Sequence, residues 1–398
     1  MKDYKGNIRP YNQQLDLGEK ILAFVIAFLA ILSCSPVIFY GFNSTLILLF
    51  IGGYFLFFVK QVFKERVSLR KNDLNIFLIS FTLFLYIAIP FREYDRFSPS
   101  VIWLFIFSMT LFLNKILLNK AFYYFSNLIL IVCIFSLFVL VLNALGVSLP
   151  NIVIPRESGG HFTSYFISVR LSWQDYSLWG LNLYRLNGIF AEPGHFGLLL
   201  CMILFVYKAI IKTIKGKIIL LTSLLTLSFG SFVLLFGFFI INIILEKKIY
   251  LAFIIVPIVV LALLYVPQEV LERFFFDKQT DLLDERTSVY FIDFYNQHYN
   301  QGDIVFGNGR DILYNNDLQN SDYRGFVIRY GYTGIFLYLI LMFSIYWKKA
   351  FTVQFLGFFY FIVVFLHRSW FVDYFAFLFF LLVLATNFNS ETKVVGLK

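Results

Sequence analysis

Two short stretches of this 398-residue chain carry charged side chains that could do chemistry. The first, RLNGIFAEPGHFGLLL, places Arg185, Glu192 and His195 directly before or at the start of an apolar run. The second, NSDYRGFVIRYGYTGIF, places Asp322 and Arg324 before another. Arginine offers a planar fork of N–H donors that matches phosphate oxygens, and carboxylate or imidazole groups exchange protons. Both stretches therefore suit chemistry on an anionic group at the edge of an apolar phase.

Long apolar runs dominate the rest of the chain. Hydrophobic residues make up 60% of the sequence, charged residues only 14%, and the mean hydropathy is +0.77. Runs of about 17 to 25 mostly apolar residues recur from end to end, and each is long enough to cross a bilayer core. We therefore expect an all-α, polytopic integral membrane protein with a single membrane domain over residues 1–398.

Clusters of lysine and arginine set the expected orientation. They lie between apolar runs, at 60–71, 208–217, 246–248 and 347–349. Such an excess of positive charge is typical of the cytoplasmic side, and its location explains the net charge of +9 without a nucleic-acid partner. The rule gives about twelve transmembrane helices, with both termini cytoplasmic. Two large loops, at about 146–192 and 267–327, then lie on the outer face.

One apolar block, residues 218–245, fits neither one ordinary crossing nor two. Basic clusters flank both ends, so the block must begin and end on the same side, yet its 28 residues fall short of two crossings of about 20 each. We predict two short helices broken at TLSFGS, residues 226–231. Freed backbone groups at membrane depth need buried protein or a watery cavity to satisfy them. The alternative is one long, tilted helix.

Aromatic and basic residues are mixed in the first outer loop. They include Trp173, Trp179, Tyr184, Arg170 and Arg185. Aromatic rings and arginines are typical of a membrane-interface belt, and the same groups grip sugar rings and phosphates. Both interpretations stay open for each residue.

The second outer loop contains one predicted helix. In DERTSVYFIDFY the apolar residues Val289, Ile292 and Phe294 or Tyr295 have helical spacing, which predicts an amphipathic helix at the surface with Arg286 near its start. The following GNG predicts a turn.

The order of these motifs resembles that of Wzy-type polysaccharide polymerases, which join O-antigen and capsule repeat units. The likeness rests on RLNGIFAEPGHFGLLL, then TLSFGS, then RTSVY, GNG and the SDYRGF…YGYTGIF run. Local motifs cover residues from about 185 to 335, and the expected topology extends the likeness along most of the chain. The resemblance implies a glycosyltransferase of the bacterial inner membrane whose site faces the periplasm.

The reaction implied by the resemblance moves a growing glycan from undecaprenyl diphosphate onto the non-reducing sugar of a fresh lipid-linked repeat unit. Its implied partners are this undecaprenyl-diphosphate-linked oligosaccharide, membrane lipid and a polysaccharide chain-length regulator. The outer loops carry neither a DxD motif nor paired histidines, so we expect no metal and no cofactor.

The resemblance also assigns roles to residues. The diphosphate calls for arginines, which are Arg185, Arg286, Arg324, Arg170 and Arg310. The acceptor hydroxyl calls for a general base, and the candidates are Glu192, which matches the Glu-Pro position of the family, Asp322 and His195. The sugars call for aromatic rings, which are Trp173, Trp179, Tyr184 and Tyr290. The alternative role for Glu192 is an ion pair that holds Arg185 at the interface.

Two other functions stay open. O-antigen ligases share the architecture, but they place a histidine in the later loop, where this chain has NSDYRG. A lipid-linked oligosaccharide flippase would also have about twelve spans. Transporters usually show internal repeats and ionisable residues near the midplane, and the apolar runs here are nearly free of charge.

Overall fold

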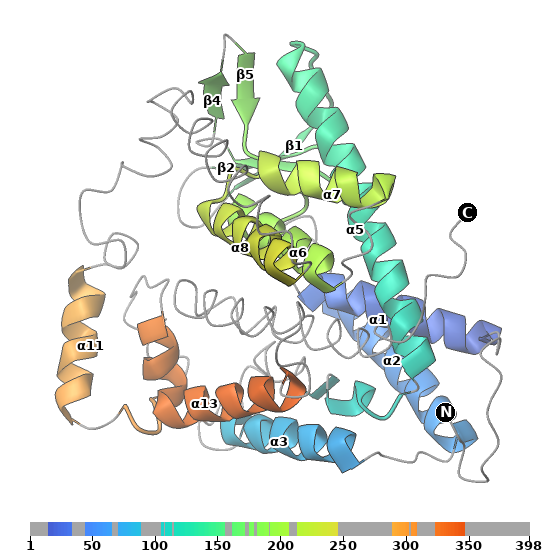
Figure 1. The fold of residues 1–398 in the computed structure, drawn as a ribbon, viewed down its shortest axis with the longest axis vertical. Coiled ribbons are helices and arrows are strands. Elements are labelled where there is room, and N and C mark those ends of the chain that lie inside the picture. The colour runs from blue at the N-terminus through green and yellow to red at the C-terminus, as the bar shows by residue number, and fades with distance from the viewer. Residues whose placement is uncertain are drawn as a thin grey trace.

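A computed structural model gives the fold of the chain (Figure 1). It describes residues 15–33, 44–65, 71–88, 105–106, 108–113, 115–155, 161–171, 175–178, 181–190, 192–206, 213–245, 289–301, 304–308 and 323–346. The apolar runs near 249–266, 351–366 and 370–387, where we expect further spans, lie outside these residues. The described part is mostly helical.

Long apolar helices form the first half of the described chain. They are α1 (Leu17–Ser33), α2 (Ser44–Glu65), α3 (Lys71–Ala88) and α5 (Lys115–Ala144). α1 begins with a reciprocal cap, in which Glu19 N donates to Asp16 Oδ1 at 2.8 Å and Asp16 N donates to Glu19 Oε2 at 2.9 Å. α1 is largely buried between its neighbours, with Leu22 and Ala23 almost inaccessible.

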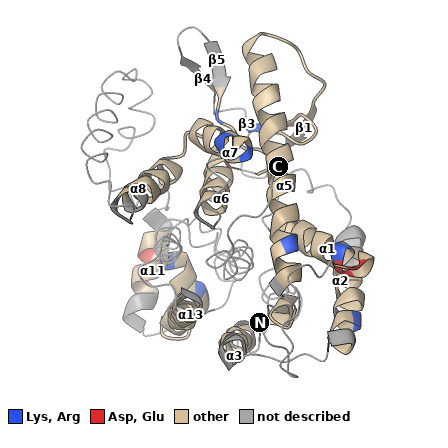
Figure 2. Ribbon diagram, turned by 45° about the vertical axis from the view of Figure 1, so that its right-hand side comes forward, with Lys and Arg blue, Asp and Glu red and all other residues tan. Residues whose placement is uncertain are grey.

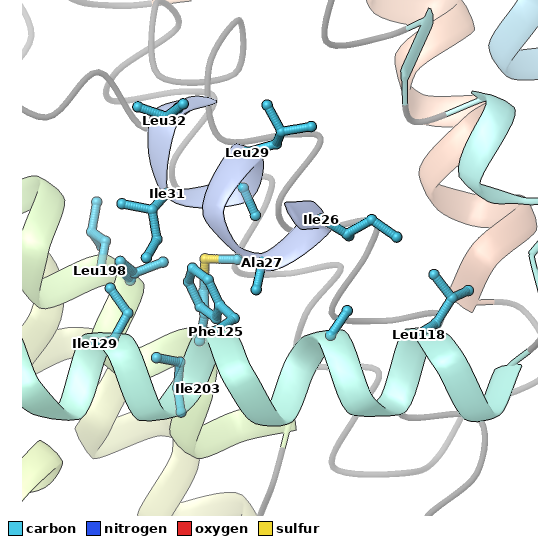
Figure 3. Close-up of a cluster of buried hydrophobic side chains, with 14 of the residues drawn as sticks. Ile26, Ala27, Leu29, Ile31, Leu32, Leu118, Phe125, Ile129, Leu198 and Ile203 are labelled. Atoms are coloured by element: carbon cyan, nitrogen blue, oxygen red, sulfur yellow. The ribbon is translucent and has the colours of Figure 1, made fainter. Parts of the chain in front are cut away.

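The second half contributes a group of helices around α6. These helices are α6 (Pro193–Val206), α7 (Ile214–Leu225) and α8 (Phe229–Leu245). α6 packs on both α7 and α8, and α7 also contacts α5. Figure 3 shows Phe125 of α5 pointing toward Ala27 of α1, with Leu198 and Ile203 of α6 beside them. One apolar core therefore joins the N-terminal helices to the α6 group.

Two further helices lie later in the chain, α11 (Val289–Gln301) and α13 (Tyr323–Tyr346). α13 lies beside α3, and α11 packs on α13 (Figure 1). α11 confirms the helix predicted in the second outer loop. Its buried face carries Phe291 and Tyr295, whereas Ile292 is only partly buried and Asp293 is exposed. The predicted face is therefore right at Tyr295, while Phe291 takes the fully buried place that we expected for Ile292.

Two described helices are long and apolar enough to cross a membrane, Ile116–Ala144 and Tyr323–Ser344. Shorter apolar helices accompany them, at Leu49–Phe63, Leu74–Tyr86, Pro193–Leu204 and Gly230–Ile240. Figure 2 shows few charged residues along the described helices. This distribution agrees with the apolar composition that suggested membrane spans.

The all-α expectation is wrong in the first outer loop, which contains short strands. They are β1 (Ile152–Pro155), β2 (His161–Ser164), β3 (Val169–Leu171), β4 (Asp175–Leu178) and β5 (Leu181–Tyr184). β1, β2 and β3 form an antiparallel sheet in that order, and β4 pairs with β5. In β2, Phe162 and Ser164 are buried and His161 is exposed, the two-residue period of a strand. This alternation, with the β-branched run at 152–154, was a signal that the sequence carried.

The predicted break at 226–231 is confirmed. α7 ends at Leu225 and α8 begins at Phe229. Between them Leu227 has a φ of 47°, a left-handed value that a residue inside a right-handed helix does not adopt. The alternative of a single tilted helix is therefore wrong.

A second break lies in α13, where we expected an unbroken span near 328–346. Gly331 has φ 65° and ψ 178°, so the helix stops and starts again there. Glycine adopts this conformation without the strain that a Cβ atom would add. The structure has a turn at 304–306, directly before the predicted GNG turn, and Gly307 has a left-handed φ of 77°.

Candidate functional site

Arg185 reaches the break between α7 and α8. Its Nε donates to the carbonyl oxygen of Thr226 at 3.2 Å, and its Nη2 donates to that of Leu227 at 2.9 Å. Beside it, Leu186 N donates to Leu225 O at 3.3 Å. The last carbonyls of a helix lack partners within that helix, and a cation complements the negative end of the helix dipole. Arg185 therefore closes the end of α7, a role that no sequence signal indicated.

α6 forms the other side of this break through a glycine. A Cβ atom on Gly197 would lie 2.1 Å from Ser231 Oγ and 2.5 Å from Thr226 Oγ1. Thr226 Oγ1 donates to Ser223 O at 2.7 Å, and Ser223 Oγ lies 3.3 Å from Cys201 Sγ. Small residues let helices approach this closely, and hydroxyl groups between them find nearby acceptors. The α6 helix is thus fitted closely against the break.

Glu192 and His195 occupy the start of α6. The carbonyl of Glu192 accepts from His195 N at 3.1 Å, and Pro193 holds the first helical position, which suits its fixed φ. The two side chains also face each other, because His195 Nε2 lies 3.9 Å from Glu192 Oε2. The side chain of Glu192 is 28% exposed and that of His195 only 4%. A carboxylate that is accessible on one side and backed by an imidazole can take a proton from an approaching hydroxyl.

Gly188, in the loop between Arg185 and Glu192, is packed tightly on both sides. Gly188 has a φ of 58°, and a Cβ atom there would lie 2.9 Å from the ring of Phe196. Its carbonyl accepts from Val169 N of β3 at 2.7 Å. The loop therefore sits between the strands and α6. Gly188, which lies in the loop between Arg185 and Glu192, is therefore held on both sides.

Arg170 and Tyr184 form a contact of a different kind. The guanidinium carbon of Arg170 lies 5.3 Å from the centre of the Tyr184 ring, a cation–π arrangement. Tyr184 is 2% exposed and packs with Val139 and Leu140 of α5. Burial raises the pKa of Tyr184 well above its ordinary value, so the phenol is protonated at neutral pH. The expectation that this ring contacts a sugar conflicts with its burial, since no face is open to a ligand.

The other predicted residues are not gathered with Arg185 in the described part of the chain. Arg324 lies in the first turn of α13, which belongs with α3 and α11. Tyr290 lies at the start of α11. Outside the described residues are Asp322, Arg286, Arg310, Trp173 and Trp179. Their roles stay predictions.

The break in α13 is closed by the segment at 304–308, which contains a turn at 304–306. Tyr332 N donates to Ile304 O at 2.9 Å, and Thr333 N donates to Val305 O at 3.1 Å. These are the first N–H groups of the second part of α13, which have no partner within the helix. Backbone carbonyls of another segment thus do the work that side chains often do at a helix start.

Two glycines and one tyrosine complete the second break. A Cβ atom on Gly331 would lie 2.5 Å from the carbonyl carbon of Phe306, and one on Gly307 would lie 2.5 Å from Gly331 N. Tyr86 Oη, from α3, lies 2.8 Å from both Phe306 O and Tyr330 O. A phenol has one hydrogen, so the two carbonyls share it. Glycine at both 307 and 331 was the only sequence signal for this contact.

Arg329, beside the second break, is a buried cation whose place the sequence did not single out. It is 7% exposed, and its Nε donates to Gly325 O at 3.1 Å, one turn back along the helix. Its guanidinium carbon lies 5.6 Å from the Tyr330 ring. Cations inside apolar helices are costly and often functional, which makes Arg329 a further candidate.

Within the described ranges, no three His, Cys, Asp or Glu side chains gather closely enough to hold a metal ion. Comparisons of the chain with protein-family models, with curated proteins and with solved structures find no match. Function must therefore be inferred from the residues at the first break and at the start of α6, the helix packed against it. They offer a fixed cation, a partly exposed carboxylate and a buried imidazole.

Proposed function

We propose that this chain is a membrane glycosyltransferase that polymerises undecaprenyl-diphosphate-linked oligosaccharide repeat units at the periplasmic face of the bacterial inner membrane. One observation carries the proposal. Arg185 bonds to the break at Thr226 and Leu227, while Glu192 and His195 pair at the start of α6, the helix fitted against that break. Two motifs that resemble those of Wzy-type polymerases, RLNGIFAEPGH and TLSFGS, thus lie together in space.

The membrane placement is part of the proposal. The two long apolar helices and their shorter apolar neighbours support it, as do the basic clusters between apolar runs. We propose about twelve spans, both termini in the cytoplasm, and the loops at about 146–192 and 267–327 in the periplasm. The break between α7 and α8 would then lie near the outer surface, because Arg185 belongs to the first of these loops.

The proposed reaction is a substitution at the anomeric carbon of the growing glycan. A hydroxyl on the non-reducing sugar of the fresh repeat unit attacks C1. The bond between C1 and the diphosphate oxygen breaks, and its electron pair leaves with undecaprenyl diphosphate. The hydroxyl proton passes to Glu192, which His195 orients. Bonds formed and broken balance without a metal or a cofactor.

Arg185 would stabilise the charge that develops on the diphosphate. The proposal needs its positive charge in a fixed place, and the two carbonyl contacts supply that fixation. A cation that is already positioned does not need to reorganise during the reaction, so its effect on the barrier is larger. Arg286, Arg310 and Arg324 of the second outer loop, together with Arg170, are proposed as the remaining cations.

The test is turnover by the purified full-length protein in lipid vesicles supplied with an undecaprenyl-diphosphate-linked repeat unit. We expect a ladder of lengthened products that survives a chelator. Glu192→Gln should abolish the ladder, because the amide cannot accept the proton. The control is Asp293→Asn on α11, which removes an exposed carboxylate of the second outer loop from a helix that carries none of the proposed catalytic residues and should keep the ladder. Loss of product on chelation, or a full ladder in Glu192→Gln, would contradict the proposed chemistry.

The same preparation separates the two alternative functions. A ligase would leave single units unextended and would transfer preformed polymer to a lipid A core sugar. A flippase would move units across the vesicle membrane without joining them. Either result from folded, reconstituted protein would replace the polymerase proposal.

A further inference from the structure

The turn between β2 and β3 carries an exposed aromatic residue in an unusual backbone conformation. Tyr165 N donates to Ser168 O at 2.7 Å and Ser168 N donates to Tyr165 O at 3.3 Å, so Phe166 and Ile167 are its two central residues. Phe166 has a φ of 63° and is 79% exposed. Tight hairpins usually place glycine at such a position, and a bulky side chain there is an outlier. In water, neither the conformation nor the exposure would favour phenylalanine.

Only one side of this turn packs on the protein. Tyr165 is 7% exposed and joins the cluster around Val139 and Leu140 of α5, and Ser168 is fully buried. Ile167 packs against the main apolar core. Phe166 alone points outward. The turn is therefore held from behind, while its tip is presented to the surroundings.

The tip lies beside the body of α5 and not beyond its end. The rings of Phe166 and Phe135 are 6.2 Å apart between centroids. If Lys120 marks the inner edge of the bilayer core, a core length of about 20 residues ends near Leu140. Phe135 then lies about five residues, or roughly 8 Å, inside the outer edge of the core. The turn reaches the same depth.

An exposed apolar stripe on α5 leads to this turn. Its members recur every three or four residues and are 49% to 72% exposed: Ile131, Ile134, Phe138, Val141 and Leu145. The ring of Phe135 lies 6.4 Å from that of Phe138 and bridges the stripe to Phe166. A stripe of this kind on a candidate membrane span faces acyl chains. Phe166 extends the same surface.

We propose that the β2–β3 turn is a wedge that inserts Phe166 among the acyl chains of the outer leaflet, alongside α5. The inference rests on the membrane placement given under the proposed function, and on none of the proposed chemistry. The wedge also has a consequence for the site. β3 bonds to Gly188 through Val169 N at 2.7 Å, so the depth of the turn fixes the depth of the loop that carries Arg185 and Glu192.

The test places a nitroxide label on Phe166→Cys in the full chain and reconstitutes it in vesicles of phosphatidylethanolamine and phosphatidylglycerol. Power-saturation spectroscopy then compares access by oxygen, which concentrates among acyl chains, with access by a water-soluble nickel chelate. His161→Cys, at the exposed far end of the same hairpin, is the matched control. The unmodified chain, which carries the buried Cys133 and Cys201 and also Cys34, gives the background. We expect the oxygen-to-nickel ratio to be several-fold higher at 166 than at 161.

A third label, on Phe138→Cys in the α5 stripe, separates the two levels of the proposal. If the label at 138 shows the high oxygen-to-nickel ratio of acyl chains and the label at 166 shows the low ratio of water, the wedge is wrong and the membrane placement stands. If 138 also has the ratio of water, the membrane placement fails and the wedge fails with it. Low access to both reagents with dipolar broadening at 166 would mean that a second copy of the chain covers the turn, which would overturn the lipid assignment.

A second measurement covers the case in which Phe166→Cys does not fold. Amide hydrogen exchange of the unmodified chain in the same vesicles reports on the peptide from 161 to 171. Slow exchange at 166 and 167, relative to 161, supports insertion of the tip, because water is scarce among acyl chains. Fast exchange at 166 and 167 would contradict it.

Discussion

The two broken helices of this protein are closed in different ways. A charged side chain, Arg185, closes the break between α7 and α8. Backbone groups of 304–308 and the neutral phenol of Tyr86 close the break in α13. Each closure meets the same need, because a buried backbone group left without a partner costs about 1 to 3 kcal/mol. The first closure also fixes a positive charge at the break against which α6, the helix that begins next to Glu192, is fitted, and this difference is why we assign the chemistry to the first break.

The glycines at the two breaks differ in the same sense. Gly197 faces the side-chain oxygens of Ser231 and Thr226, whereas Gly331 faces the backbone of Val305 and Phe306. Side chains can rotate or be replaced, and backbone cannot. The first break should therefore tolerate compensating substitutions that the second does not.

The largest expected effect is that of Gly331→Ala. Its Cβ atom would lie 2.4 Å from Val305 O, and the φ of 65° is strained for alanine. Left-handed strain and overpacking together should lower the free energy of unfolding by about 2 to 5 kcal/mol. Thermal unfolding of the detergent-solubilised chain measures this. Gly237→Ala in α8, where a Cβ atom meets nothing within 4 Å, is the matched control and should change stability by about 1 kcal/mol or less. Equal stability of both variants would mean that α13 is not broken at 331.

Arg185→Ala should have the next largest effect, a loss of about 2 to 3 kcal/mol, because two charge-assisted hydrogen bonds to the end of α7 disappear. Arg185→Lys keeps the charge but cannot hold both carbonyls in a fork. Its stability should therefore fall between that of the unmodified chain and that of Arg185→Ala. The control is Arg170→Ala, which removes a cation–π contact of about 0.5 to 1 kcal/mol on the same loop. A similar loss in Arg170→Ala and Arg185→Ala would remove the special role of Arg185 at the break.

Gly197→Ala should cost about 1 to 3 kcal/mol through overpacking against Ser231 and Thr226. Adding Ser231→Ala removes the nearest oxygen and should restore part of that loss. A double-mutant cycle on thermal stability measures the recovery. If the losses of stability from the two substitutions simply add, the contact between position 197 and the Ser231 side chain does not limit the packing at the first break.

The smallest expected effect is that of Tyr86→Phe, which keeps the ring and removes only the hydroxyl shared by Phe306 O and Tyr330 O. One neutral hydrogen bond should account for about 1 kcal/mol. Tyr332→Phe, a half-exposed tyrosine in the same region, is the control and should change stability by less than about 0.5 kcal/mol. A loss in Tyr86→Phe as large as that in Arg185→Ala would contradict the contrast between charged and neutral closure.

Several features of the fold followed from local sequence. The apolar runs predicted the helices that now appear as α1, α2, α5 and α6. Basic clusters on both sides of 218–245 predicted the break between α7 and α8, because charge and length constrain a membrane-sized block without reference to other parts of the chain. Helical spacing predicted α11. In each case the information lies within a few tens of residues.

The arrangement of the site was less predictable. Charge type and position singled out Arg185, Glu192 and His195, but the carbonyls that Arg185 contacts lie 41 and 42 residues away. Tyr184 looked like a sugar contact because aromatic rings favour interfaces, and its burial became visible only through its packing on α5. The strands of the first loop were not predicted, although a two-residue period was present. The aromatic and basic residues of this loop suggested a membrane interface instead of a sheet.

The sequence by itself determined that this chain is mainly helical, that its long apolar runs are interrupted by basic clusters, and that one helix must break near 226–231. Only the tertiary structure decided what closes that break, that α13 breaks as well, and that the Phe166 turn lies against the body of α5. The physical reason is one of range. Hydrophobic periodicity and charge act over neighbouring residues, whereas a freed carbonyl or a glycine contact is satisfied by whichever distant segment the fold brings within hydrogen-bonding distance.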